Sequence, residues 1–495
     1  MKRLTRLFLP LLFISFIIPS CVVQQSPITG QKRAYAYSWD QEVQIGKDVD
    51  SEIVREFGLY DDEGVADYFN EISKVILENS HMRREETADQ FRETVFTFRV
   101  LDSPVVNAFA LPGGYVYVTR GLMAHMNNEA QLAVVIGHEI GHVAARHASQ
   151  RGLQQTIGSV VVLGGAILGQ ELLGLPGETI LNLSSQAAGL LFLSYSRNHE
   201  RESDRLGVEY AAKTGYVAAE GAAFFTSLKR ISERAGQSIP SLLSTHPDPG
   251  ERERNIPRKA REWEENGYEQ TILNTETYME ILDGMIYGEN PRNGFREENT
   301  YFHPELAFHF PIPQNWIMIN QPSQVVLLSP EQDAVMILRI DNESSNARES
   351  VQSFLSANNI ETDDQRANQS GNLTAYEANF FIQDENQNLG VNIYALEYGS
   401  RVYRFINYTE RNKFDSMKPR FAETTGGFRQ LDDQRILNIN PVRLSIRQLD
   451  RDTRFRDLLP QSLPMNIAPE EIAIVNQVYL DDTIPAGTFV KIPVQ

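Results

Sequence analysis

The sequence predicts an α+β protein of several domains, and three observations support this fold class. A chain of 495 residues is too long for one ordinary domain, and about two to four are expected. Apolar residues recur at helical spacing through much of the first part, whereas strand-like alternation dominates from residue 301. Residues 287–294 (YGENPRNG) lie between the two parts and are typical of a linker. We therefore expect a mainly helical domain with a small sheet at 36–290, an antiparallel α+β module at 301–431 and a small βααβ module at 436–495.

The first 21 residues have the organisation of a secretory signal. A basic N-terminus precedes an apolar run at 7–18, and Cys21 follows as the only cysteine of the chain. The tetrapeptide 18–21 (IPSC) is similar to the lipobox of bacterial lipoproteins, which implies that Cys21 is lipidated and becomes the mature N-terminus. A plain signal peptide and an N-terminal membrane anchor are the alternatives. Residues 22–35 are polar and aperiodic, so we expect a tether from the lipid to the folded body.

The charge and the cysteine content of the chain limit its partners and its covalent structure. The formal net charge at pH 7 is −19 and the pI is about 5.0. Nucleic-acid binding needs a basic surface that neutralises phosphates, so we expect no nucleic-acid partner. A single cysteine cannot form an internal disulfide, and lipidation would explain the lone thiol.

Periodicity places the elements of the first domain in order. Apolar residues at three- and four-residue spacing predict helices at 39–59 and 61–79. Three strand-like segments follow, at 94–101, 105–110 and 114–119, and a Pro-Gly-Gly turn separates the last two. The next helix should begin after an asparagine cap, at position 127 or 128.

That helix carries residues 137–142 (GHEIGH), the motif around which the chemistry is predicted. Residues four positions apart lie on one face of a helix, so His138 and His142 can bind the same metal ion. Glu139 lies beside them and is placed to act as the general base on a water molecule at the metal. The alternative is a pair of histidines on a half-buried structural helix.

The most hydrophobic internal stretch, at 157–175, follows this helix. Its unbroken apolar part is too short to span a bilayer comfortably. A buried helical hairpin and a mobile, membrane-facing flap over the active site are both compatible with it.

A second helix, near residues 197–213, carries acidic candidates for the same site. A zinc site with two histidines needs at least one more protein ligand, and Glu200 is our candidate. Asp204 lies one turn further along the same face, where it can hydrogen-bond the free nitrogen of a ligand histidine. A solvated acidic helix face is the alternative interpretation.

Four motifs together resemble the zinc metallopeptidase family (gluzincins) that contains HtpX, BepA and the CAAX prenyl endopeptidases. The resemblance covers roughly residues 26–260 and rests on VVNAFALPGGYVYVTRGLM (105–123), GHEIGH (137–142), SRNHERESD (196–204) and STHPDPGER (244–252). The family motif has alanine before the aspartate of SRxxExxAD, and Ser203 stands at that position here. The resemblance implies a zincin-type, mainly helical peptidase domain with one Zn²⁺ per chain.

The resemblance also assigns a role to each matching residue. It implies that His138, His142 and Glu200 bind zinc, that Glu139 is the general base, and that Asp204 supports a ligand. Asn107 and Ala108 would lie in a strand that borders the cleft and pairs with an extended substrate. His246 would lie on a loop near the metal, where it regulates access or stabilises the oxyanion, and Arg252 would contact the substrate or the oxyanion.

The resemblance further implies a compartment and a function. Apart from the signal, the sequence shows no long transmembrane segments, so it is similar to the periplasmic lipoprotein branch, and we expect an outer-membrane lipoprotein facing the periplasm. The predicted activity is zinc-dependent endoproteolysis of unfolded or misassembled envelope proteins. The alternatives are a latent peptidase that acts as a chaperone or assembly factor for outer-membrane proteins, and a peptidoglycan-associated hydrolase.

The C-terminal half shows no catalytic constellation. Residues 301–431 alternate like strands around helices at 347–358 and 414–424, and by pattern they resemble small PsbP-like binding modules. Residues 436–495 resemble a LysM-type module, which implies peptidoglycan as a possible partner. The Gly-Asp-Thr start of LysM modules is altered here, because Arg451 replaces the glycine. A docking domain without glycan affinity is the alternative.

Overall fold

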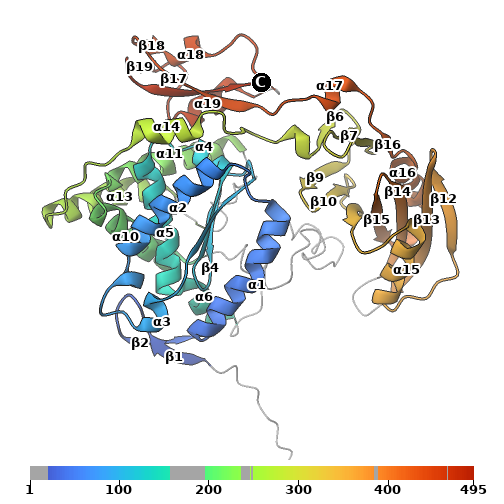
Figure 1. The fold of residues 1–495 in the computed structure, drawn as a ribbon, viewed down its shortest axis with the longest axis horizontal. Helices are drawn as coiled ribbons and strands as arrows, with labels where there is room; N and C mark the ends of the chain where they lie inside the picture. Colours follow the sequence, from blue (N-terminus) through green and yellow to red (C-terminus); the bar gives the residue numbers. More distant parts are fainter. Residues whose placement is uncertain (1–20, 156–194, 236–245, 247–248, 384–387, 465–466) are drawn as a thin grey trace, which may run out of the picture.

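The computed structural model describes residues 21–155, 195–235, 246, 249–383, 388–464 and 467–495 (Figure 1). Cys21 is exposed within this part of the chain. The rest of the expected signal peptide and the apolar stretch 157–175 lie outside the described residues. The described residues form an α+β protein of several helices and sheets, as the sequence predicts.

The N-terminal domain is mainly helical around one small sheet. Its helices are α1 (Trp39–Phe57), α2 (Glu63–Glu78), α3 (Asp89–Arg92), α4 (Arg120–Ala124), α5 (Glu129–Ala145), α6 (His147–Gln155), α10 (Arg197–Lys213), α11 (Gly221–Ala235), α13 (Pro249–Glu265) and α14 (Thr275–Leu282). Its sheet has the order β3-β5-β4, with strands β3 (Thr97–Leu101), β4 (Ala108–Leu111) and β5 (Tyr115–Thr119). β5 is parallel to β3 and antiparallel to β4. Apolar residues of α1 cover one face of this sheet, and those of α2 and α5 cover the other (Figure 1).

Residues 22–35 are not the aperiodic tether that the sequence suggests. They form an antiparallel hairpin, β1 (Val22–Gln25) and β2 (Lys32–Tyr35). The hairpin is anchored by Arg146, whose guanidinium stacks 3.7 Å from the ring centre of Tyr35 and donates to Gln24 Oε1 at 2.9 Å. Polar strands are stable here because a buried arginine far along the sequence supplies their partners.

Helices α5 and α10 pack backbone to backbone because both carry glycines at their contact. A Cβ atom at Gly137 would lie 2.9 Å from the carbonyl oxygen of Gly207, and one at Gly207 would lie 2.8 Å from the nitrogen of His138. No side chain fits in such a space, so the two axes approach closely. Asn128 caps α5 by accepting from Gln131 N at 3.0 Å, one of the two caps that the sequence predicts.

The central module is a seven-stranded antiparallel sheet with the order β12-β13-β14-β15-β11-β10-β9. These strands are β9 (Ile317–Gln321), β10 (Gln324–Leu328), β11 (Ala334–Asp341), β12 (Gln365–Ser370), β13 (Leu373–Gln383), β14 (Asn388–Tyr398) and β15 (Arg401–Glu410). Helix α15 (Ala347–Ala357) packs on one face. The other face is covered by α16 (Phe414–Gly426) and by a four-stranded sheet of β6 (Phe295–Glu297), β7 (Thr300–His303), β8 (Phe308–Pro311) and β16 (Arg429–Gln430).

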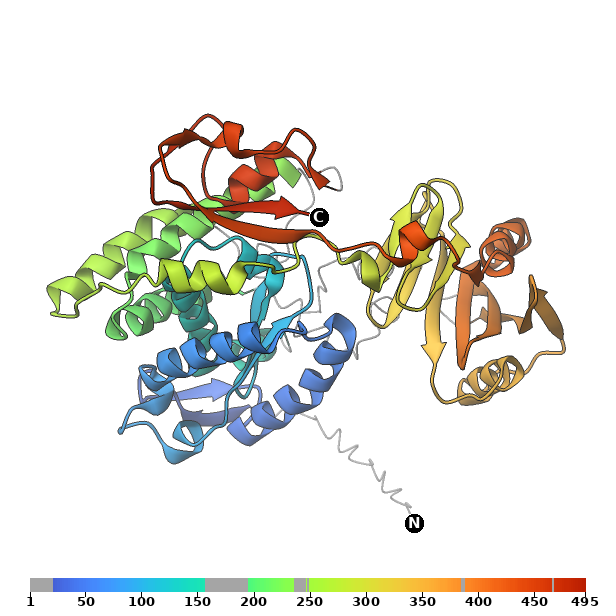
Figure 2. The ribbon, with the colours of Figure 1, turned by 45° about the horizontal axis from the view of Figure 1, so that its top comes forward.

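The chain then returns through α17 (Gln434–Leu437) to the N-terminal domain (Figure 2). The C-terminal module consists of β17 (Arg443–Gln448), β18 (Thr453–Arg454), α18 (Phe455–Leu458), α19 (Pro469–Val475), β19 (Thr483–Ile484) and β20 (Phe489–Val494). β17 pairs with β20 antiparallel, and β18 pairs with β19, so the module has four strands around two helices where the sequence suggests two. The fully buried Lys491 donates to the carbonyl oxygens of Ala124 and Met126, at 2.9 and 2.7 Å. This module is therefore docked on the domain that carries α5.

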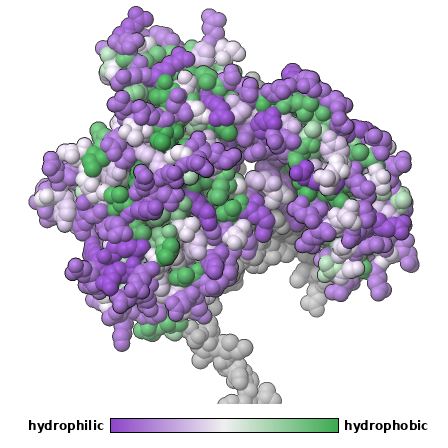
Figure 3. All heavy atoms as spheres, in the orientation of Figure 1, coloured by the Kyte–Doolittle hydropathy of each residue, from purple (hydrophilic) through white to green (hydrophobic). Residues whose placement is uncertain are grey.

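Hydrophilic residues cover most of the face seen in the space-filling view, and hydrophobic residues form scattered groups on it (Figure 3). Among the described residues, no helix combines the length and the apolar composition needed to cross a bilayer.

Candidate metal centre

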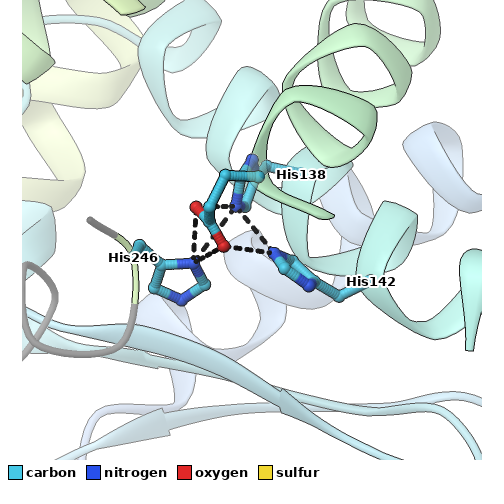
Figure 4. Close-up of side chains that lie close together, drawn as sticks. His138, His142 and His246 are labelled. Carbon is cyan, nitrogen blue, oxygen red and sulfur yellow. Dashed lines mark hydrogen bonds and ion pairs between the residues drawn. The ribbon is translucent and has the colours of Figure 1, made fainter. Parts of the chain in front are cut away.

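Four buried side chains from α5, α10 and residue 246 converge on one point (Figure 4). The Nε2 atoms of His138 and His142 are 3.0 Å apart, and His246 Nδ1 lies 3.3 Å from that of His138. The Glu200 carboxylate completes the group. Its oxygens lie 3.4 Å from His142 Nε2, 3.7 Å from His138 Nε2 and 3.2 Å from His246 Nδ1. The structure thus brings together the two histidines of the motif, the predicted third ligand and the predicted loop histidine.

These separations fit a single small cation. Ligand atoms that surround a tetrahedral zinc ion at about 2.0–2.1 Å lie about 3.3 Å from one another. Burial lowers the pKa of His138 and His142 well below the usual range, and it lowers that of His246. Neutral imidazoles are the form that binds metals, because their ring nitrogens then keep a free lone pair. The donor set of three imidazoles and one carboxylate therefore suits a metal ion.

Glu139 lies beside this group on α5. Its Oε1 atom is 3.7 Å from His246 Nε2, and its Oε2 atom has no hydrogen-bond partner among the described residues. Burial raises the pKa of Glu139, and His246 and Arg252 oppose this shift. A carboxylate whose pKa is moved toward neutrality exchanges protons more readily near pH 7.

Asp204 and Arg252 contact the ligand side chains. Asp204 Oδ1 lies 2.9 Å from His138 Nδ1, near the predicted position, although this nitrogen makes no hydrogen bond of good geometry among the described residues. Arg252 forms an ion pair with Glu200, and its Nε lies 3.2 Å from Asp204 Oδ2. The sequence suggests a substrate or oxyanion contact for Arg252, whereas in this structure its guanidinium is engaged by the carboxylates of α10.

Asn107 and Ala108 lie at the start of β4, next to the site. A backbone group of Ala108 is close enough to the His246 ring to influence its pKa. Asn107 N donates to Thr119 Oγ1 at 3.2 Å. Within the described residues β4 pairs only with β5, so its outer edge has no strand partner. That edge is where an extended peptide could add as a further strand.

His147 and Glu202 contact the site but were missed by the sequence reasoning. His147 Nδ1 lies 3.1 Å from His142 Nδ1, and His147 Nε2 lies 3.2 Å from Glu202 Oε2. If the Nε2 atom of His142 faces a metal, its Nδ1–H donates to His147, and His147 in turn donates to Glu202. A third histidine five positions after the motif, and a second acid within SRNHERESD, were the available signals.

Comparison with known proteins agrees with this geometry. Residues 70–260 match the sequence model of the family described as peptidase family M48. The chain is 28% identical over 232 residues to the beta-barrel assembly-enhancing protease of Escherichia coli, covering 46% of this chain and 45% of that protein. It is 33% identical over 173 residues to the mitochondrial metalloendopeptidase OMA1 of Bos taurus, covering 34% and 32%.

These alignments are partial, since the chain spans less than half the length of either relative. Among solved structures, that of cyanobacterial PsbP from Synechocystis covers 26% of this chain and 91% of that chain, with 15% identity and a TM-score of 0.23, which is too low to carry an inference. The family match includes α5, α10 and Arg252. The chain therefore carries a domain of peptidase family M48 at residues 70–260.

Proposed function

We propose that this protein is a zinc-dependent endopeptidase that cleaves unfolded or misassembled proteins of the bacterial envelope. The observation that carries the proposal is the convergence of His138, His142 and Glu200 within 3.0–3.7 Å, with Glu139 buried beside them. Two histidines and a glutamate leave one position of a tetrahedral ion for water or substrate, as in catalytic zinc sites. Bound zinc would polarise the peptide carbonyl and acidify a water molecule.

The residues of the chain supply the proton transfers and the orientation. Glu139 takes a proton from the attacking water and passes it to the amine of the leaving peptide. Asp204 Oδ1 lies 2.9 Å from His138 Nδ1, and Arg252 of α13 pairs with the Glu200 carboxylate, so charged neighbours restrain both ligand side chains. Pinned ligands need no reorganisation during the reaction, which favours the transition state.

The outer edge of β4, which begins at Ala108, suits an extended polypeptide. Hydrogen bonds along a strand edge use only backbone groups and carry little sequence information. Substrates are then selected by being unfolded, which fits a role in protein quality control. We place the protein at the periplasmic side of the outer membrane through a lipid on Cys21, which is exposed and lies beside the β1–β2 hairpin.

The mechanism is tested with Glu139→Gln. The amide keeps the shape of the side chain but cannot accept the proton, so casein cleavage should fall by about a thousandfold or more, corresponding to about 4 kcal/mol. Zinc content, measured by mass spectrometry of the metal, should stay at one per chain. Glu71→Gln, an exposed residue of α2, is the matched control. Wild-type cleavage by Glu139→Gln would refute the assigned role.

A second candidate, a latent peptidase that serves as an assembly factor, is favoured by the position of His246. Its Nδ1 lies 3.2 Å from Glu200 Oε1 and 3.3 Å from His138 Nε2. His246 could therefore take the fourth position on a bound metal ion, which a catalytic water molecule would otherwise need. If the open site is populated at about 1–10%, His246→Ala should raise casein cleavage about 10- to 100-fold. The control is His309→Ala in the central module. Unchanged cleavage and zinc affinity in His246→Ala would contradict this candidate.

A further inference from the structure

The central module buries a row of asparagines on one face of its large sheet. Asn379, Asn392 and Asn407 lie opposite one another on β13, β14 and β15. Their amides form a chain, with Asn407 Nδ2 donating to Asn392 Oδ1 and Asn392 Nδ2 to Asn379 Oδ1, both at 2.9 Å. They are at most 7% exposed. Burying amides is unfavourable unless their hydrogen bonds are made, so such a row calls for an explanation.

A cavity of about 260 Å³ opens between this row and helix α16, in the part of the molecule where β12–β14 and α16 adjoin (Figure 1). Its polar side includes Asn379, Asn392 and Glu377. Phe421 and Ala422 of α16 form an apolar wall. Pockets for drug-sized ligands measure roughly 300–1,000 Å³, so this cavity is suited to a smaller molecule.

The charged groups at the cavity already pair with protein groups. Arg366 Nη2 lies 2.5 Å from Glu377 Oε1, and its Nη1 lies 3.5 Å from Asp364. Lys418 pairs with Asp415 at 2.9 Å. Two cations and two carboxylates line the cavity, so their formal charges cancel. A charged ligand would have to compete with these ion pairs, whereas a neutral ligand leaves them intact.

Tyr394 brings to this cavity a buried polar group that has no hydrogen-bond partner among the described residues. Its side chain lines the cavity, is 2% exposed, and its hydroxyl makes no hydrogen bond to any of the described residues. Burial raises the pKa of this phenol to about 12, so it stays neutral and can both donate and accept. A buried hydroxyl without a partner, on a side chain that lines a polar cavity, indicates where a ligand group could bind.

We propose that this cavity binds an uncharged, hydroxyl-rich molecule about the size of one sugar ring. Ring hydroxyls would pair with the Tyr394 phenol and with the second amide hydrogen of Asn379, whose first hydrogen is donated to Asp364 Oδ2 at 3.0 Å. The C–H face of the ring would lie against Phe421 and Ala422. The site is separate from the metal centre and does not depend on the proposed peptidase activity. The same hydroxyl chemistry is offered by a free monosaccharide and by the end of a glycan chain.

The test measures ligand binding to the full chain, with saturation-transfer NMR and calorimetry as the two methods. The probes are glucose and N-acetylglucosamine, tetra-N-acetylchitotetraose as a glycan, and serine as a zwitterion. We expect binding of a sugar. Equal affinity for monosaccharide and oligosaccharide indicates a free sugar, whereas tighter binding of the oligosaccharide indicates a glycan end. Binding of serine alone, or of none of the probes at 10 mM (about 2.7 kcal/mol), overturns the proposal.

Two variants locate the site. Tyr394→Phe removes only the hydroxyl and should weaken sugar binding about tenfold. Ala422→Trp is at an exposed position of α16, so it should fold while filling the cavity, and it should abolish binding. Tyr479→Phe makes the same change at an exposed tyrosine of the C-terminal module and should bind as the wild type. Binding lost in Tyr479→Phe and kept in both other variants assigns the sugar to the C-terminal module and overturns the proposal.

Discussion

Two buried polar clusters lie one turn apart at the end of α5, and they differ in how their atoms face one another. Around Arg146 every contact joins a donor to an acceptor. Its guanidinium donates to Glu42 Oε1 at 2.6 and 2.8 Å, to Gln24 Oε1 and to the carbonyl oxygen of Tyr37. Around His142, three imidazole nitrogens and a carboxylate face one another instead. A complete set of partners indicates a structural cluster, whereas converging acceptors indicate a site that suits a cation.

The structural cluster also shapes the functional one. Arg146 ends α5 in the left-handed conformation, with φ of 59°, which is unfavourable for a residue with a Cβ atom by about 1–2 kcal/mol. The bonds of its buried guanidinium hold it there. Because of this turn, the chain doubles back at His147, whose ring then lies against that of His142. The cluster around Arg146 therefore positions His147, a residue that contacts the candidate metal centre.

The largest effect, on the free energy of unfolding, is expected when the hydrogen-bonded cluster around Arg146 is disrupted. Arg146→Met leaves the carboxylate of Glu42 buried without its counter-ion, which should lower the free energy of unfolding by about 3–5 kcal/mol. The measurement is urea unfolding of the metal-free protein at pH 8, above the pKa of about 7 that burial gives Glu42 while Arg146 opposes the shift. Without Arg146 the folded state must either bury an unpaired carboxylate or take up a proton at this pH, and both are unfavourable. Adding Glu42→Gln to Arg146→Met should recover part of the loss.

The same measurement on the metal centre sharpens the comparison. His142→Gln removes one of several facing acceptors, so the metal-free protein should lose about 1 kcal/mol or less. Zinc binding should be lost at the same time. If His142→Gln destabilised the metal-free protein as much as Arg146→Met, the distinction between the two clusters would be wrong.

The sequence predicts the metal centre better than its surroundings. Periodicity places the two histidines of HExxH on one face of a helix, and a second acidic helix supplies Glu200, so local patterns are sufficient to find the residues that converge there. The N-terminal hairpin could not be predicted, because its stability depends on Arg146, more than 100 residues away. His147 was missed for a related reason, since a left-handed turn at an arginine has no signature in the sequence.

The C-terminal half shows more clearly what sequence patterns cannot predict, namely the contacts between strands and between domains. Pattern predicts both helices of the central module, at 347–358 and 414–424, to within two residues. It does not separate β10 from β11, and it misses β9 and β12. It does not give the register between strands. The asparagines at 379, 392 and 407 are unremarkable one by one, and they form a buried row only because three strands place them side by side. Nor does a lysine in a strand predict that Lys491 docks into another domain.

An intermediate effect, on zinc affinity, is expected at His147, which lies between His142 and Glu202 and contacts both. His147→Phe keeps the ring volume and the stacking on His199 but removes both nitrogens. The Nδ1–H of His142 then loses its acceptor, and zinc affinity should fall about 10- to 100-fold. The measurement is competition with a chromophoric chelator. Glu202→Gln, which retains an acceptor for His147, should have a smaller effect, and equal zinc affinity in His147→Phe and wild type would contradict the proposed relay.

The smallest effect is expected at Glu56, a buried carboxylate with only part of its set of hydrogen-bond partners. Its Oε2 accepts from Ser323 of the central module at 2.6 Å, whereas its buried Oε1 has no hydrogen-bond partner among the described residues. Burial raises its pKa to about 7, although Ser323, Arg339 and Arg55 oppose the shift. The docked form therefore binds the proton more tightly than a solvated carboxyl does, so the contact is strongest below about pH 4.5 and weakens as the pH rises through 7.

Small-angle scattering can detect this loosening of the central module. The radius of gyration should be larger at pH 8 than at pH 6, because a buried carboxylate with one unpartnered oxygen favours separation of the two surfaces. Glu56→Gln cannot ionise and should remove the pH dependence, whereas the exposed Glu269→Gln should not. A radius that changes equally in Glu56→Gln would assign the effect to other groups. If the radius of gyration of the wild type did not depend on pH, one hydrogen bond would be sufficient to keep a buried carboxylate in place. An incomplete set of hydrogen-bond partners would then not distinguish the candidate metal centre from the cluster around Arg146.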